Sequence, residues 1–288
     1  MGKLQRQGTL LALTAAGCAP PPPGPRDLTE TMRAFWRTMT TAEDEELLRY
    51  LTAAVEQVDA EELEGGPVAG TQLAFRAPDL EVVDFHEPDG SPRGRPDPDK
   101  ALPAYLLGRL DCTVEQFLDV IVTDDQNAAY GSVRNGDTPY EAYSRKYHTS
   151  KRDFRSGASR TMSWEGSLTT YVPLAGTYVY DFRSDARRVA IPDDLVEELG
   201  LGHDEFVMTR TWLPYPAAWE GSSTFDQDYQ LEVVIPWTAT EVVKIYPVWR
   251  EWSTPLGDFG NGTVIEITLG QMRAWDESTQ KLCQGEGG

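Results

Sequence analysis

The residues of this sequence best suited to chemistry form a basic cluster in an otherwise acidic chain. The whole chain has a net charge of −20, yet the segment from Arg134 to Arg188 contains ten basic and six acidic residues. A positive cluster in an acidic protein can hold an anion, such as a phospholipid headgroup or a sugar phosphate. It can equally form a solvated face, or pair with acidic neighbours in the fold. The candidate anion-binding residues are Arg145, Lys146, Lys151, Arg152, Arg155 and Arg160, with His148 among them.

The three cysteines of the chain suggest one modified residue and one pair. If Cys18 carries a modification, Cys112 and Cys283 remain as a pair that an oxidising compartment would allow to bond. Such a disulfide would tie the end of the chain to its middle and stabilise it by roughly 4–5 kcal/mol. The alternative is two separate buried thiols. Two cysteines without a nearby histidine do not predict a metal site.

The sequence carries no local enzyme signature. The GxSxG, HExxH, P-loop and GxGxxG patterns are absent. Asp258-Phe259-Gly260 matches a kinase tripeptide, but the other kinase motifs are missing, and His86, His148 and His203 stand far apart. We therefore predict no catalytic residue, no cofactor and no metal, and favour a non-enzymatic role. Spacing alone does not decide whether folding assembles a carboxylate pair of the glycosidase type.

The first residues predict export. Lys3 and Arg6 precede an uncharged, mostly apolar stretch that is too short to span a bilayer, the layout of a signal peptide. Residues 15–18, Ala-Ala-Gly-Cys, resemble the lipobox of bacterial lipoproteins, although Ala15 stands where that family usually has leucine. The resemblance implies cleavage after residue 17 and a lipid anchor on Cys18. Ala19, the residue after that cysteine, favours the outer over the inner membrane. The alternatives are an ordinary secretory signal cleaved nearby and a disordered cytosolic N-terminus.

The mature chain would be a soluble acidic domain on a short tether. Residues 18–26 are rich in proline and predict a stiff spacer. Without Lys3 and Arg6, the remaining 24 basic and 46 acidic residues give a net charge of −22, which argues against nucleic acid as a partner. The membrane, reached through the anchor, is the expected partner, and the sequence identifies no protein partner.

Residues 27–288 predict a single α+β domain, with an N-terminal helical pair followed by a mostly antiparallel sheet and one or two further helices. Residues 27–66 are helical, 67–100 are rich in loops, and 101–288 are rich in strands. Capping signals and helical spacing place helices at 28–39, from 40 or 41 to 58, from 113 onward, and at 192–199. Strands are expected at 80–85, 102–110, 168–172, 177–182, 206–213, 229–235, 241–249 and 263–269.

The run ALPAYLLGRLDCTVEQFLDVIVTDDQNAAY, residues 101–130, resembles the opening of a helix-grip (START-like) domain. That resemblance, which covers about thirty residues and the general order of elements, implies a curved sheet around an apolar cavity. The sequence departs from the family at its end. Because few residues follow the strand expected at 263–269, we expect the long C-terminal helix that closes the family's cavity to be missing.

Large aromatic residues are concentrated in the strand-rich part, with seven of the eight tryptophans after residue 160. Such residues line apolar pockets, stack on sugars or anchor interfaces, and they also simply fill a sheet. The sequence thus favours a membrane-tethered envelope lipoprotein that acts as a binding module for a lipid or another apolar ligand. A glycan-binding or glycan-cleaving protein and an assembly partner without a small ligand are the alternatives.

Overall fold

The computed structural model describes residues 25, 27–58, 60–70, 77–123, 140–172, 176–218, 224–253 and 261–286. The predicted signal peptide, Cys18 and most of the tether lie outside the described residues, as does the Asp258–Gly260 tripeptide. Within the described part of the chain, no helix has the length and apolar character that a membrane span requires.

One antiparallel sheet of nine strands forms the centre of the domain. Its strand order is β1-β2-β9-β8-β6-β5-β4-β3, and the short β7 pairs with β8. The α+β class is therefore confirmed. The strands are β1 Val68–Gly70, β2 Leu102–Leu110, β3 Tyr140–Tyr147, β4 Thr161–Val172, β5 Gly176–Ala190, β6 Glu205–Trp212, β7 Ala217–Ala218, β8 Thr224–Pro236 and β9 Val242–Ser253.

The predicted helix starts at residues 27 and 113 are confirmed. The Asp27 side chain accepts a hydrogen bond from the Glu30 backbone, and Thr113 forms a reciprocal capping box with Gln116. More helices follow the N-terminal pair than the one or two expected. The helices are α1 Leu28–Thr38, α2 Asp44–Gln57, α3 Ala60–Glu64, α4 Val114–Val122, α6 Lys151–Arg155, α7 Asp193–Leu199 and α8 Asn261–Cys283, with 3-10 turns at Leu80–Val82 and Pro98–Lys100.

Two strand predictions are wrong. Residues 80–85 begin with a 3-10 turn, which the Asp79 carboxylate stabilises by accepting a hydrogen bond from the backbone of Glu81. Residues 263–269 belong to α8, so the long C-terminal helix that we expected to be missing is present. Ile265, Ile267 and Leu269 alternate with polar residues as in a strand, and so short a segment does not distinguish a strand from a helix. The helical period appears over a longer stretch, because Val264, Thr268, Met272 and Thr279 are all buried.

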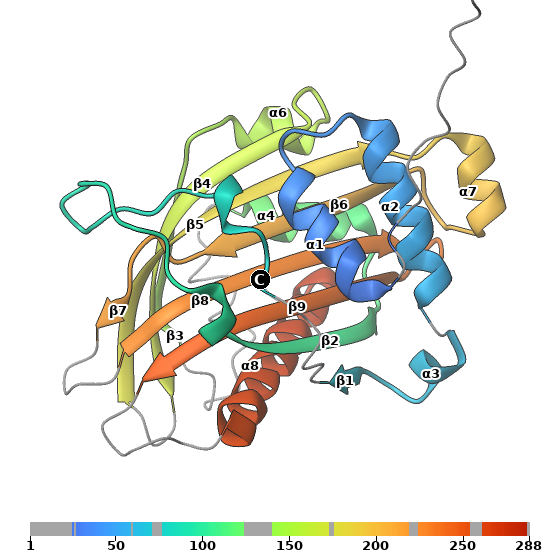
Figure 1. The fold of residues 1–288 in the computed structure, drawn as a ribbon. Coiled ribbons are helices and arrows are strands. Elements are labelled where there is room, and N and C mark those ends of the chain that lie inside the picture. Colours follow the sequence, from blue (N-terminus) through green and yellow to red (C-terminus); the bar gives the residue numbers. More distant parts are fainter. Residues whose placement is uncertain are drawn as a thin grey trace, which may run out of the picture.

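Helices cover both faces of the sheet (Figure 1). We call the face under α1 and α2 the outer face, and the face under α4 and α8 the inner face. Side chains alternate between the two along each strand. In β6, Phe206, Met208 and Trp212 join the core formed with α1 and α2, whereas Thr209 and Thr211 line a cavity on the inner face.

Candidate functional site

A cavity lies between the inner face of the sheet, α4 and α8. It encloses about 110 Å³. Its walls come from α4, α8 and six strands, including β3 at one edge of the sheet and β9 near the other. Strands so far apart in the sheet can line one cavity because the sheet curves around it. The curved sheet and the closing helix are the two features that the resemblance of residues 101–130 implies.

Apolar and aromatic side chains form part of the cavity lining. Phe117 and Ile121 of α4 and Met272 of α8 are among them. The Tyr143 ring meets those of Phe182 and Trp275, each with 5.9 Å between ring centroids. Aromatic groups of this kind are the usual lining of a site for an apolar molecule. Further aromatic wall residues are Trp164, Tyr180 and Tyr246.

Polar side chains of the central strands form the floor of the cavity. Ser184, Thr211 and Gln230 follow one another across β5, β6 and β8 in register. The Ser184 and Thr211 hydroxyl oxygens are 2.7 Å apart, and the Tyr246 hydroxyl donates to the Gln230 amide oxygen at 2.7 Å. These side chains form hydrogen bonds with one another, and each of them can instead form a hydrogen bond with a polar group of a ligand.

A buried ionic group extends this floor. Lys244 of β9 is 1% exposed, and its ammonium donates to Glu232 at 2.7 Å and contacts Asp276 of α8. Burial disfavours the charged amine, but Asp276 and Glu232 outweigh it and raise the pKa of Lys244. Burial also raises the pKa of Asp276, despite the attraction of Lys244. The two carboxylates raise the pKa of Lys244, and the charge of Glu232 adds to the larger effect of burial on the pKa of Asp276.

A second buried ion pair lies on the same face. Arg250 of β9 donates to Asp228 at 2.8 Å and to the side chain of Gln271 at 2.6 Å. Burial disfavours the cation, but the adjacent Asp228 carboxylate outweighs this effect and raises the pKa of Arg250. Lys244 and Arg250 thus fasten β9 to β8 and, through Asp276 and Gln271, to α8.

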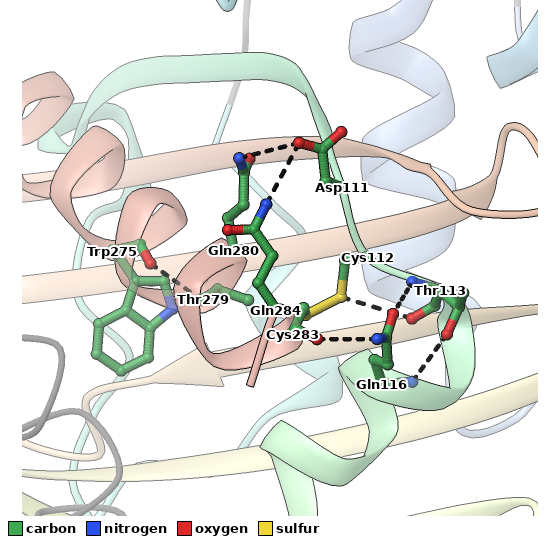
Figure 2. Close-up of a disulfide and its surroundings, with 9 residues drawn as sticks. All are labelled: Asp111, Cys112, Thr113, Gln116, Trp275, Thr279, Gln280, Cys283 and Gln284. Atoms are coloured by element: carbon green, nitrogen blue, oxygen red, sulfur yellow. Dashed lines mark hydrogen bonds between the residues drawn. A yellow bond between two sulfur atoms is a disulfide. The ribbon is translucent and has the colours of Figure 1, made fainter. Parts of the chain in front are cut away.

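A disulfide holds one end of α8 (Figure 2). Cys112 and Cys283 are bonded, with their Cα atoms 5.2 Å apart. The Gln116 side chain donates to the carbonyl oxygen of Cys283 at 2.8 Å, so the capping box of α4 is linked to the end of α8. Gln280 and Gln284 both donate to Asp111. The disulfide therefore joins the end of α8 to the residue before the N-cap of α4, which links the two helices that bound the cavity at one end.

The structure separates the six predicted anion-binding residues. Arg145 lines the cavity, where it donates to the Tyr143 hydroxyl and the Ile121 carbonyl. The other five lie away from the cavity walls. Three of them form ion pairs: Lys146 with Glu165 at 2.8 Å, Arg155 with Glu115 and Asp119, and Arg160 with Glu205 at 3.0 Å. Lys151 lies over the Tyr147 ring, and Arg152 is exposed.

Sequence reasoning missed the polar groups of the inner face. Lys244 and Glu232 each have apolar neighbours on both sides along their strands, a pattern that favours a buried pair because an isolated buried charge is costly. Asp276 has no comparable signal, because it lies in a helix that the sequence did not predict.

Comparisons with known proteins give only distant structural neighbours. No family model and no curated protein matches the sequence. Among solved structures, a START superfamily protein from Mycobacterium smegmatis is 9% identical with a TM-score of 0.39, covering 64% of this chain and 97% of that one. Human STARD10 is 9% identical with a TM-score of 0.38, covering 63% of each chain. Zhui aromatase/cyclase from Streptomyces sp. R1128 is 9% identical with a TM-score of 0.35, covering 65% and 93%. We draw no functional argument from likenesses at this level.

Proposed function

We propose that this domain is a binding module that encloses a small amphipathic ligand in the inner-face cavity. The observation that carries this proposal is the cavity itself, whose lining combines aromatic side chains with polar side chains that hydrogen-bond to one another. Unfilled space in a protein interior costs stability. A cavity that has both apolar and polar walls is therefore better explained by an occupant than by packing.

The volume limits the size of that occupant. Sites for drug-sized ligands occupy about 300–1,000 Å³, and an engineered dry cavity of about 150 Å³ holds benzene. A cavity of about 110 Å³ suits a molecule with one ring or a short alkyl chain. An intact phospholipid, one ligand that the sequence suggests, would require α4 or α8 to move.

The groups around the cavity favour binding over covalent catalysis. A lysine acts as a nucleophile through its neutral amine. Asp276 and Glu232 hold Lys244 in its charged form, which opposes that role. Histidine and cysteine are absent from the described residues that line the cavity. The glycan alternative gains no comparable support from the walls of this small cavity.

We also propose that a lipid on Cys18 tethers this module to the cell envelope, in the outer membrane. The support is the signal-like N-terminus and the lipobox resemblance of residues 15–18. Expression of the full chain in a Gram-negative host with radiolabelled palmitate tests it. Label on the wild-type chain, lost in Cys18→Ser and retained in Cys112→Ser, would support the anchor. An unlabelled wild-type chain would contradict it.

Thermal unfolding of the full chain, produced unlipidated in an oxidising host, tests the binding proposal with toluene and benzoate as probes. Saturation with a ligand at one hundred times Kd stabilises the folded chain by about 2.7 kcal/mol. Val120→Phe should abolish this gain because it fills the cavity, whereas Val122→Phe in the same helix should retain it, since Val122 does not line the cavity. If neither probe stabilises the wild-type chain, the proposal fails.

A further inference from the structure

Two hydroxyl groups in the cavity lining form a hydrogen bond that leaves one of their protons over. Ser184 of β5 and Thr211 of β6 lie opposite each other in register, and their hydroxyl oxygens are 2.7 Å apart. Each hydroxyl carries one proton, and the hydrogen bond between them uses one of the two. Among the described residues, neither hydroxyl has another hydrogen-bond partner. The pair therefore keeps one free donor.

Burial decides which of the two hydroxyls keeps the free proton. Ser184 is 1% exposed, and an unpaired donor there would cost its full desolvation penalty, so Ser184 donates to Thr211. The neighbouring Trp212 points into the outer core, so the Thr211 side chain points to the inner face, where it lines the cavity. Thr211 is half-buried although β6 lies in the middle of the sheet. Its accessible surface therefore opens toward the cavity, where its proton can meet an acceptor.

Gln230 of β8 places a second donor beside this one. It is half-buried, lines the cavity and lies opposite Thr211 in register, a position in which Cβ atoms are about 4.5–5.5 Å apart. Its amide oxygen accepts from the Tyr246 hydroxyl at 2.7 Å, and its nitrogen donates one hydrogen to the Asp228 carboxylate at 2.9 Å. The second hydrogen of that nitrogen has no acceptor among the described residues.

We infer that Thr211 and Gln230 together bind one oxygen atom of the ligand, which is a ring or a short alkyl chain with a carbonyl or carboxyl group. This inference rests on the proposed binding function and assigns its ligand class. A carbonyl oxygen has two lone pairs and can accept both hydrogens at once. A pure hydrocarbon would bury both donors without a partner. The apolar part of the lining, which includes Phe117, Ile121 and Met272, surrounds the rest of the molecule.

Isothermal titration of the full chain with cyclohexanone and with methylenecyclohexane tests this assignment. The two probes have nearly the same shape, and a methylene group replaces the carbonyl oxygen in the second. Water hydrates the ketone more strongly, so the informative quantity is the change that a substitution causes in each affinity. Thr211→Val keeps the shape of the side chain and removes the hydroxyl. It should lower the affinity for cyclohexanone about 5- to 30-fold and that for methylenecyclohexane by less than about twofold.

Two variants serve as matched controls. Thr209→Val makes the same substitution two residues earlier in the same cavity lining, where the hydroxyl already donates to Glu232 at 2.8 Å. Ser184→Ala removes the other member of the hydroxyl pair and leaves the Thr211 donor in place. Each of these controls should change the affinities for the two probes by similar factors.

Infrared difference spectroscopy of the wild-type chain avoids any loss of folding in the variants. A hydrogen bond weakens a carbonyl bond, so the C=O stretch of bound, isotope-labelled cyclohexanone should lie below its frequency in cyclohexane. An unshifted frequency, or a cyclohexanone affinity that Thr211→Val leaves unchanged, would overturn the assignment and leave the binding module standing. If the chain binds neither probe but toluene still stabilises it, only the assignment falls. If toluene and benzoate fail as well, the proposed function falls with it.

Discussion

The same strands form both faces of the sheet, but the side chains on the two faces differ. Those on the outer face pack into a closed core, and those on the inner face surround a cavity. On the outer face, Trp36 of α1 is fully buried and its ring packs against Tyr229 and Trp249 with centroids 6.1 and 6.4 Å away. On the inner face, the alternate residues include hydroxyls, amides and ions as well as aromatic side chains, and they surround an open volume. Around the cavity, the inner side of the strands thus keeps polar groups and space that the closely packed outer core lacks.

The polar groups of the outer face support the same contrast. Arg210 donates to the carbonyl of Trp36 at 2.8 Å, and Arg187 donates to that of Met39 at 2.9 Å. Carbonyls at the end of a helix lack partners within the helix, so these arginines fasten α1 to the sheet. They serve packing, whereas the polar residues of the inner face surround a cavity. The burial of polar groups alone therefore does not mark a binding site. Unfilled space beside buried polar groups does.

The largest expected effect compares one tryptophan from each face. Trp36→Ala should destabilise the domain by about 3–5 kcal/mol, because it removes a fully buried ring from a closely packed core. Trp275→Ala should cost less, about 1–2 kcal/mol, because Trp275 is half-buried beside space that is already empty. Urea unfolding of both variants measures the difference. Equal losses of stability in the two variants would contradict the proposed difference between the two faces.

The next effect tests the buried ions of the inner face. Lys244→Met should destabilise the domain by about 3–5 kcal/mol, because it leaves Glu232 and Asp276 without their cation. Lys146→Met is the matched control. Its side chain is 75% exposed and pairs with Glu165 at the surface, so its loss should cost at most about 1 kcal/mol. Chemical denaturation at neutral pH compares them, and a small loss for Lys244→Met would show that the ionic group is not structural.

The pH dependence of stability sharpens this comparison. The pKa of Asp276 is raised in the folded state, so the folded chain holds that proton more tightly than the unfolded chain does. The wild type should therefore lose stability relative to Asp276→Asn as pH rises from about 4, the ordinary value for aspartate. The loss should level off above the raised pKa. Denaturation of both chains from pH 4 to 7 measures the difference, and a difference independent of pH would contradict the assignment.

The smallest effect concerns the helix that closes the cavity. Gly270 lies within α8, and a Cβ added there would meet no atom within 4 Å. Gly270→Ala should therefore stabilise the domain by about 0.5–1 kcal/mol through helix propensity. At Gly200, where φ is +66°, the same substitution should destabilise it. Thermal unfolding checks both signs. Destabilisation by Gly270→Ala would count against a helix at this position.

The sequence predicted the fold better than the site, for a physical reason. The strands at 206–213 and 241–249 were predictable because segments rich in β-branched and aromatic residues end at turn residues. The start of α4 was predictable because a capping box is local. The closing helix α8 was missed because its first turns alternate like a strand.

The cavity could not be predicted because its groups come from distant parts of the chain. Glu232, Lys244 and Asp276 meet only when two strands pair and α8 packs across them. Arg145 was singled out for its charge, but its place in the cavity depends on α4, whose Ile121 carbonyl it contacts. The basic cluster in the sequence therefore predicted the position of the cavity poorly, since five of its six residues lie away from the cavity walls.

The most direct test of the account is to locate a bound ligand on one face of the sheet. Met272 lines the inner cavity, and Met208 is buried in the outer core. With methyl-labelled methionine and saturating benzoate, we predict nuclear Overhauser effects from the ring protons of benzoate to the Met272 methyl group and none to that of Met208. Contacts to Met208, or none to Met272 despite binding, would contradict the assignment of the inner face as the binding face.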